Sequence, residues 1–201
     1  MINSIHCDEK CHEISCVTLE EEGISVEFGE DLTLNGDLDF NHVAILKPDL
    51  FYNTRRFATP PRSVDGIIIV EGDIGITLYI AELKSSRSPN INKTEIQAKF
   101  DTIFKQFLTD DYSHIFEDLS YNLNDIKLWL VCDPFQLRKK CHSDADYISR
   151  VKKITARLTG MMADMRASYK PYKYKGHSVN IQPMLSPPTI YKNGFVDLLN
   201  P

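Results

Sequence analysis

The middle of the chain carries two apolar, β-branched segments joined by a short polar turn. Val64 to Val70 and Ile76 to Leu83 flank Glu71-Gly72-Asp73, which has the composition of a turn. The second segment is apolar at odd and even positions alike, which is typical of a strand that is covered on both faces. We therefore expect an antiparallel hairpin inside a layered protein, and this hairpin restricts where the rest of the chain can pack.

The segments that follow the hairpin predict alternating helices and strands. A helix should begin at Asn92, which forms a capping box with Glu95. Its apolar stripe recurs with helical spacing at Ile96, Phe100, Ile103, Phe104 and Phe107. A buried strand is expected over Ile126 to Cys132, a long second helix from near Ser143 to a point before Pro171, and a last strand over Val179 to Met184. The stripe of the second helix comprises Tyr147, Ile148, Val151, Ile154, Leu158, Met161, Met162 and Met165.

The first part of the chain predicts short strands separated by turns. They are expected over Ile14 to Glu20, Ile24 to Phe28, Asp31 to Leu34 and Val43 to Leu46. We expect one domain over 1–201, which is α/β with a central mixed β-sheet flanked by helices. Within it, 1–58 is an acidic, strand-rich segment, 59–135 forms the core, and 136–201 holds a basic helix and a C-terminal strand and tail.

The charge is distributed unevenly along the chain. The net charge is −5, yet residues 1–53 hold twelve acidic and two basic side chains, whereas residues 137–175 hold eleven basic and three acidic ones. The basic part could face a phosphate backbone, or it could pair with the acidic part inside the same domain. Five cysteines without a secretory signal or a membrane-spanning apolar run predict an intracellular protein with reduced thiols and no membrane contact.

Three charged residues should meet at one end of the hairpin. Asp65 begins the first strand, whereas Glu82 and Lys84 end the second at a spacing that places them on one face. Two carboxylates and an ammonium are costly to bury without partners. Carboxylate oxygens are suitable ligands for Mg²⁺ or Mn²⁺.

Asp65 followed across one turn by Glu82-Leu83-Lys84 resembles the PD-(D/E)XK phosphodiesterase superfamily, although Val64 replaces the usual proline. The resemblance extends from Asp65 to Cys132 and implies a restriction-endonuclease-like core. It implies that Asp65, Glu82 and the Leu83 carbonyl hold the metal, that Lys84 orients or activates the attacking water, and that Gln97 on the next helix supports the site.

The resulting prediction is a Mg²⁺- or Mn²⁺-dependent endonuclease that hydrolyses phosphodiester bonds in DNA. One alternative is an RNA endonuclease of the same superfamily, such as the enzymes with which viral polymerases cleave host transcripts. Another is a non-catalytic nucleic-acid-binding module on the same fold. Cleavage of both strands of a duplex would require a homodimer or a partner subunit.

Basic side chains near the core and in the C-terminal third are candidate nucleic-acid contacts. The run from Tyr169 to Lys175 alternates aromatic and basic residues, so its rings could stack on bases, or its tyrosines could pack back on the domain. The predicted contacts are Arg55, Arg56, Arg62, Lys99, Arg150, Lys153, Arg157, Lys170, Tyr172, Lys173 and Lys175.

Other metal-ligating residues offer competing interpretations. A cluster of histidines and cysteines near the N-terminus could bind Zn²⁺, with Cys141 and His142 completing the site, or its thiols could be unligated. This cluster comprises His6, Cys7, Cys11, His12 and Cys16. His42 and Asp49 are further possible ligands, and the glutamate that many superfamily members supply from an N-terminal helix could be Glu20, Glu21, Glu22 or Glu27.

Overall fold

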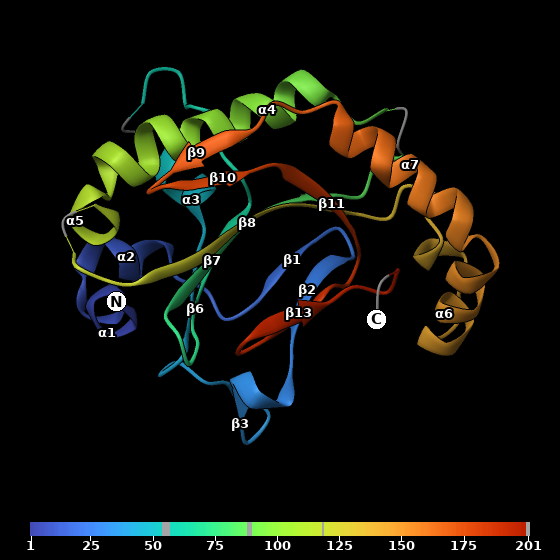
Figure 1. Ribbon diagram of the computed structural model, residues 1–201, viewed down its shortest axis with the longest axis horizontal. Coiled ribbons are helices and arrows are strands. Elements are labelled where there is room, and N and C mark those ends of the chain that lie inside the picture. The colour runs from blue at the N-terminus through green and yellow to red at the C-terminus, as the bar shows by residue number, and fades with distance from the viewer. Residues whose placement is uncertain (54–56, 88–89, 118, 200–201) are drawn as a thin grey trace.

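A five-stranded mixed β-sheet forms the centre of the structure, a computed structural model that describes residues 1–53, 57–87, 90–117 and 119–199 (Figure 1). The predicted hairpin is its middle: β6 (Gly66–Glu71) pairs antiparallel with β7 (Ile76–Lys84). The full order is β11-β8-β7-β6-β5. In this sheet β5 (Val43–Leu46) is antiparallel to β6, whereas β8 (Leu123–Cys132) is parallel to β7 and β11 (Ile181–Leu185) is parallel to β8.

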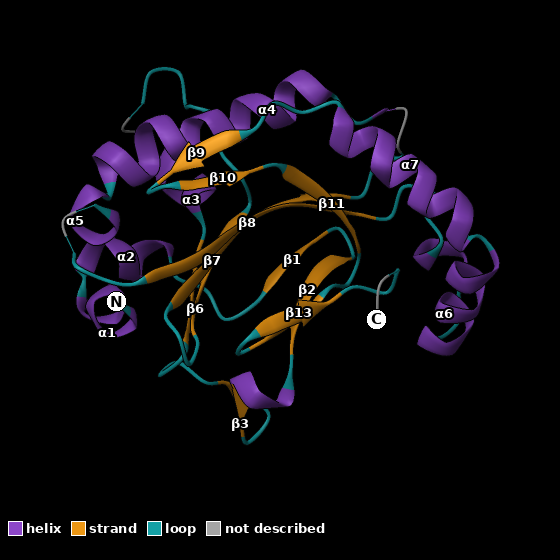
Figure 2. Cartoon of the chain, viewed as in Figure 1, coloured by secondary structure: helices purple, strands orange, loops and turns teal. Residues whose placement is uncertain are grey.

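Helices cover one face of this sheet (Figure 2). The predicted first helix, α4 (Lys93–Thr102), begins at Asn92, whose side chain accepts hydrogen bonds from the backbone of Thr94 and Glu95. It continues as a π-helical segment, η3 (Ile103–Asp111). Alternate residues of β7, such as Leu78 and Ile80, belong to the hydrophobic cluster on the helical side. The α4–η3 stripe packs there because its apolar residues repeat with helical spacing.

A smaller four-stranded sheet covers the opposite face, in the order β1-β2-β12-β13. Its strands are β1 (Leu19–Glu21), β2 (Ile24–Phe28), β12 (Thr189–Tyr191) and β13 (Gly194–Val196). The intervening residues of β7, Tyr79, Ala81 and Leu83, pack into this second cluster with Trp129 of β8. The central strands are therefore covered on both faces, as the continuous apolar pattern predicts.

The remaining elements lie around these layers. At the N-terminal side are α1 (Ile2–Cys7), α2 (Glu9–Ile14), η1 (Glu30–Leu32), β3 (Thr33–Leu34), β4 (Asp37–Leu38) and α3 (Pro48–Tyr52). After η3 come α5 (Ser113–Phe116), η4 (Arg138–Lys140), α6 (Asp144–Lys153), α7 (Thr155–Ala167) and the hairpin of β9 (Tyr172–Tyr174) with β10 (His177–Val179). The protein is thus mixed α/β with mixed sheets flanked by helices, as expected.

Several predicted elements differ in extent or type. The strand expected from Ile14 to Glu20 is wrong at its start, because Ile14 ends helix α2 and β1 begins only at Leu19. The long second helix is two helices, interrupted at Ile154, whose backbone leaves the helical conformation. The strand predicted over Val179 to Met184 is also divided, since Val179 ends β10 and Ile181 begins β11.

No helix in the described parts of the chain is both long and apolar enough to cross a membrane.

Candidate active site

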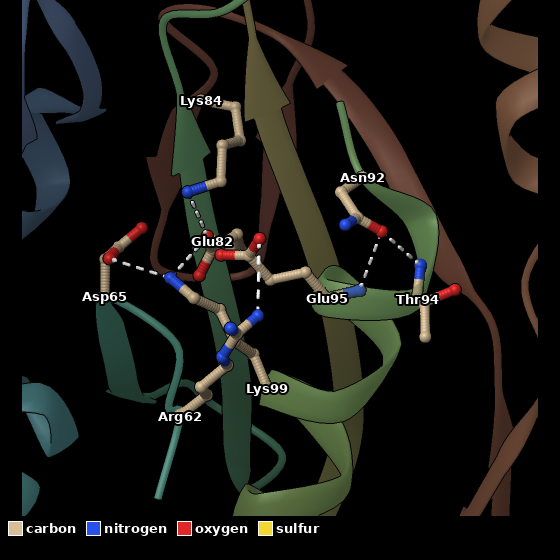
Figure 3. Close-up of polar contacts among 8 residues, drawn as sticks. All are labelled: Arg62, Asp65, Glu82, Lys84, Asn92, Thr94, Glu95 and Lys99. Atoms are coloured by element: carbon tan, nitrogen blue, oxygen red, sulfur yellow. Dashed lines mark hydrogen bonds and ion pairs between the residues drawn. The ribbon is translucent and has the colours of Figure 1, made fainter. Parts of the chain in front are cut away.

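The hairpin brings Asp65, Glu82 and Lys84 together at one end of the central sheet (Figure 3). Gly66 pairs with Ala81, so the same register extended by one residue places Asp65 opposite Glu82. Asp65 Oδ2 accepts a hydrogen bond of 2.6 Å from the Leu83 backbone N–H. A strand residue directs its N–H and C=O to the same neighbour, so the Leu83 carbonyl faces the side on which Asp65 lies.

Glu82 is a fully buried carboxylate with an asymmetric environment. Its Oε1 atom forms ion pairs with two ammonium groups, Lys84 Nζ at 2.6 Å and Lys99 Nζ at 2.7 Å. Its Oε2 atom is buried and has no hydrogen-bond partner among the described residues. Burial raises the pKa of Glu82 to about 7, the charge of Asp65 adds to this, and the two ammonium groups oppose it. The two ammonium groups therefore do not fully offset the cost of burying the Glu82 charge beside Asp65.

Lys99 belongs to this site, although the sequence suggested a surface contact with phosphate. Its ammonium, on a side chain only 14% exposed, lies 3.8 Å from Asp65 Oδ1 in addition to its bond with Glu82. The reason is its position on α4, between the stripe residues Ile96 and Ile103, which directs it toward the sheet.

Lys84 is one-quarter exposed, in contrast to Glu82. Burial lowers the pKa of Lys84, but the charge and hydrogen bond of Glu82 outweigh this and raise it overall. The ammonium therefore stays charged at neutral pH while part of it faces solvent. Among Asp65, Glu82, Lys84 and Lys99, the Lys84 side chain is the most exposed, so a substrate that arrives from solvent can contact it.

Two further carboxyl groups lie near Asp65. Partial burial of the Glu21 carboxyl, the charge of Asp65 and a hydrogen bond with it raise the pKa of Glu21. Burial and the charge of Asp65 also raise the pKa of Asp49, whose Oδ1 atom is buried without a partner among the described residues. Of the four glutamates considered for an upstream role, Glu21 lies beside Asp65, from a strand and not from a helix. Glu22 instead accepts a hydrogen bond from Ser85.

Gln97 of α4 lies close to Lys99 in sequence and contacts the run from Tyr169 to Lys175. The Gln97 side chain accepts a hydrogen bond of 3.1 Å from the Lys170 backbone and donates one to the Tyr172 hydroxyl. Its polar atoms thus bond to the C-terminal segment and to Asp101, and not to Asp65 or Glu82. The same contacts fix residues 170–172 beside the helix that carries Lys99.

Burial contradicts the stacking role predicted for Tyr172. Its ring is 8% exposed and stacks on Phe104 with centroids 4.7 Å apart, and its hydroxyl donates to Asp101 at 2.8 Å. Tyr174 is buried as well, whereas Lys173 between them is exposed. The alternation within β9 is that of a strand with one covered face, so the tyrosines pack on the domain. Lys170, Lys173 and Lys175 are exposed, and the Lys175 ammonium lies 4.4 Å from the centre of the Tyr121 ring.

Tyr172→Phe is expected to lower the free energy of unfolding by about 1–2 kcal/mol, because it removes the hydroxyl that joins β9 to α4. Urea denaturation measures this loss. Affinity for nucleic acid, the partner expected from the sequence, should be the same in the variant and the wild type, since the ring is covered. A Phe variant with wild-type stability and weakened nucleic-acid binding would contradict the structural role.

The other predicted basic contacts are dispersed. Arg62 is exposed near the carboxylates, where it forms an ion pair of 3.4 Å with Glu95 (Figure 3). Arg150 pairs with Asp146 at 3.0 Å, and the Arg157 guanidinium lies over the Phe135 ring at 4.7 Å. Helix α6, which carries Arg150 and Lys153, lies at the end of α7 away from α4 (Figure 1). Arg55 and Arg56 lie outside the described residues.

The N-terminal histidines and cysteines form separate contacts. The His6 ring bonds to the Phe40 carbonyl at 3.0 Å, the Cys16 thiol to the Thr18 carbonyl at 3.1 Å, and Cys11 is buried. His42 precedes β5 and its carbonyl bonds to the Glu71 backbone, at the end of the hairpin opposite Asp65. Within the described ranges, no group of three or more His, Cys, Asp or Glu side chains is arranged to hold a metal ion.

The carboxylate site nevertheless has a donor set of the kind that binds a hard cation. Asp65 and Glu82 contribute two carboxylates, and the Leu83 carbonyl is a third oxygen on the same side. The observation that favours such a ligand is the buried Oε2 atom of Glu82, which has no partner in the part of the chain that the structure describes. In comparisons with family models, curated proteins and solved structures, none matches this chain, so the geometry of the site is the basis for assigning its function.

Proposed function

We propose that this chain is a divalent-metal-dependent endonuclease that hydrolyses phosphodiester bonds in DNA. The observation that carries the proposal is the opposed pair of Asp65 and Glu82, in which Glu82 is fully buried and one of its oxygens has no partner among the described residues. A buried acceptor without a partner costs stability, and a divalent cation would satisfy it.

The order of elements around this pair supports a restriction-endonuclease-like core. The hairpin β6–β7 is followed by helix α4 and then by β8, which is parallel to β7. The positions of Asp65, Glu82 and Lys84 on this hairpin resemble those of the motif residues of the PD-(D/E)XK superfamily. We therefore propose membership of that superfamily.

The proposed ligands of Mg²⁺ or Mn²⁺ are Asp65, Glu82 and the Leu83 carbonyl, with Glu21 and Asp49 beside Asp65. A bound cation would polarise the scissile phosphate and lower the pKa of a coordinated water. Lys84, which is charged and partly exposed, would orient the attacking water and stabilise the charge that develops on the phosphate.

The basic residues near α4 are the proposed nucleic-acid contacts. Lys170, Lys173 and Lys175 are exposed, and the segment that carries them is hydrogen-bonded to Gln97, two residues from Lys99 of the site. Arg62 is exposed three residues before Asp65. Phosphates bound along this surface would lie close to the carboxylates.

Replacing Lys170, Lys173 and Lys175 together by Gln is expected to weaken DNA binding and to reduce its salt dependence. Each lost phosphate contact lowers the slope of log affinity against log salt by about 0.9, so the loss of three lowers it by about 2.7. Fluorescence anisotropy over a salt series measures both effects. The matched triple variant replaces Lys10 of α2, Lys127, which pairs with Asp125, and Lys192, which pairs with Asp73. It should keep the wild-type slope, and equal slopes in all three proteins would contradict the assignment.

Incubation of the protein with plasmid DNA and with a structured RNA, in Mg²⁺, Mn²⁺ or EDTA, tests the proposed activity. We expect DNA cleavage with either metal and none in EDTA. Asp65→Asn should be inactive, whereas Asp73→Asn, an exposed carboxylate in the turn at the other end of the hairpin, should cleave normally. Cleavage of RNA alone would reassign the substrate, and binding without cleavage of either polymer would contradict the enzymatic proposal.

A further inference from the structure

The Lys99 ammonium lies between the carboxylates that the proposed function assigns to the divalent cation. It is 2.7 Å from Glu82 Oε1 and 3.8 Å from Asp65 Oδ1, and it reaches them from α4, outside the hairpin (Figure 3). Lys84 already contacts the same Glu82 oxygen. Glu82 therefore has two ammonium groups on one oxygen and, among the described residues, none on the other.

The electrostatics of the pair explain why an ammonium is bound there. Asp65 and Glu82 oppose each other across neighbouring strands, and like charges so placed repel each other. Glu82 is fully buried and Lys99 only 14% exposed, so solvent screens their interaction weakly. Lys99 thus partly neutralises the two carboxylates that a divalent cation would otherwise neutralise.

Another acidic side chain on the same helix, Glu95, lies within reach of the Lys99 side chain. Glu95 lies four residues earlier on α4, and a Glu followed by a Lys at this spacing is a favourable helical ion pair. Glu95 is about one-third exposed and bonds to Arg62, which is 63% exposed. A long lysine side chain can move from a buried carboxylate to this exposed one without a change in the backbone.

We propose that Lys99 is an internal counter-ion that competes with the divalent cation for Asp65 and Glu82, and that it transfers to Glu95 when the cation binds. This inference rests on the proposed function, since it needs a cation at these carboxylates. The affinity for the cation then depends on Lys99 of α4 as well as on the carboxylates of the hairpin.

Calorimetric titration with MnCl₂ tests the competition without any substrate. Lys99→Gln removes the competing charge and should bind Mn²⁺ about tenfold more tightly than the wild type. Lys105→Gln is the matched control, because Lys105 lies on the same helical stretch and pairs with Asp101 at 2.6 Å but is 72% exposed. It should stay within about twofold of the wild type. Mn²⁺ should also raise the melting temperature of Lys99→Gln more than that of the wild type.

A second pair of variants keeps the test decisive if Lys99→Gln folds poorly. Lys99→Arg retains the charge and should not bind Mn²⁺ more tightly than the wild type. Glu95→Gln removes the alternative partner and should bind it a few times more weakly. Unchanged or weaker affinity in Lys99→Gln overturns the competition, and unchanged affinity in Glu95→Gln overturns the transfer. Absence of Mn²⁺ binding in the wild type and in Lys99→Gln alike overturns the proposed function as well.

Discussion

Glu82→Gln is expected to abolish metal-dependent cleavage and, at the same time, to make the protein more stable above pH 7. The cleavage is lost because an amide replaces a carboxylate among the proposed metal ligands. The gain in stability has a separate cause. Burial and the charge of Asp65 raise the pKa of Glu82 to about 7 despite two ammonium groups, so the ionised form is unfavourable in the folded state.

The sign of this effect follows from proton linkage. The pKa of Glu82 in the folded protein is about 7, above its ordinary value of 4.5, so the folded state holds the proton more tightly than the unfolded state. The stabilisation from the protonated form is complete below pH 4.5 and is lost as the pH rises to about 7. The amide that Glu82→Gln introduces never ionises, so the variant should exceed the wild type by about 3 kcal/mol above pH 7 and by little below pH 4.5.

Urea denaturation in EDTA between pH 4.5 and pH 8.5 measures this difference. Glu71→Gln provides the control, because Glu71 is exposed at the opposite end of β6. That variant should differ little from the wild type across the range and should retain cleavage. A Glu82→Gln protein that is less stable than the wild type at pH 8 would show that the two lysines outweigh the cost of burying the charge.

Lys84→Gln is expected to reduce the cleavage rate by about 10²–10⁴-fold, the range typical of a group that assists proton transfer or stabilises developing charge. It should not weaken Mn²⁺ binding, because the lysine is not a proposed ligand and its removal takes one positive charge from Glu82. The variant thus separates the reaction from metal binding.

Single-turnover cleavage and Mn²⁺ titration on the same preparation measure the two quantities. Lys93→Gln, a change at an exposed position at the start of α4, should leave both unchanged. If Lys84→Gln lost Mn²⁺ affinity in proportion to activity, the lysine would be holding the carboxylates in place and would have no separate part in the reaction.

The hairpin and the α4 helix were predictable because their signals are local. The β-branched runs on either side of Glu71-Gly72-Asp73 define two strands, and Asn92 with Glu95 defines the start of α4. The meeting of Asp65 with Glu82 follows from the hairpin register alone. It required no knowledge of the tertiary structure.

The N-terminal helices were missed because they are short and depend on packing. Each of α1 and α2 has six residues, below the length at which helices are stable alone. Their signal was a repeat of buried positions three apart, Ile2 with Ile5 and Cys11 with Ile14, with Asp8 as the N-cap of α2. In this segment, rich in charge and cysteine, the sequence predicted only a strand from Ile14 and left open a zinc site or unligated thiols.

Parts of the candidate site depend on contacts between distant segments. Glu21 reaches Asp65 from β1 because β1 and β2 pack across the hairpin, and β2 is itself paired with β12 at the other end of the chain. Lys99 carried a local signal, a lysine inside an apolar stripe, which marks a buried charge with a partner. Its partners could be identified only from the tertiary structure.

The most direct measurement is a Mn²⁺ soak of crystals of the wild-type protein, followed by an anomalous difference map. We expect an anomalous peak between the carboxylates of Asp65 and Glu82, within coordination distance of the Leu83 carbonyl, and the Lys99 ammonium displaced from Glu82. The contradicting result is a map in which Mn²⁺ occupies other sites in the crystal fully, these carboxylates show no peak, and Lys99 is still bonded to Glu82. That result would contradict the metal site and the function proposed from it.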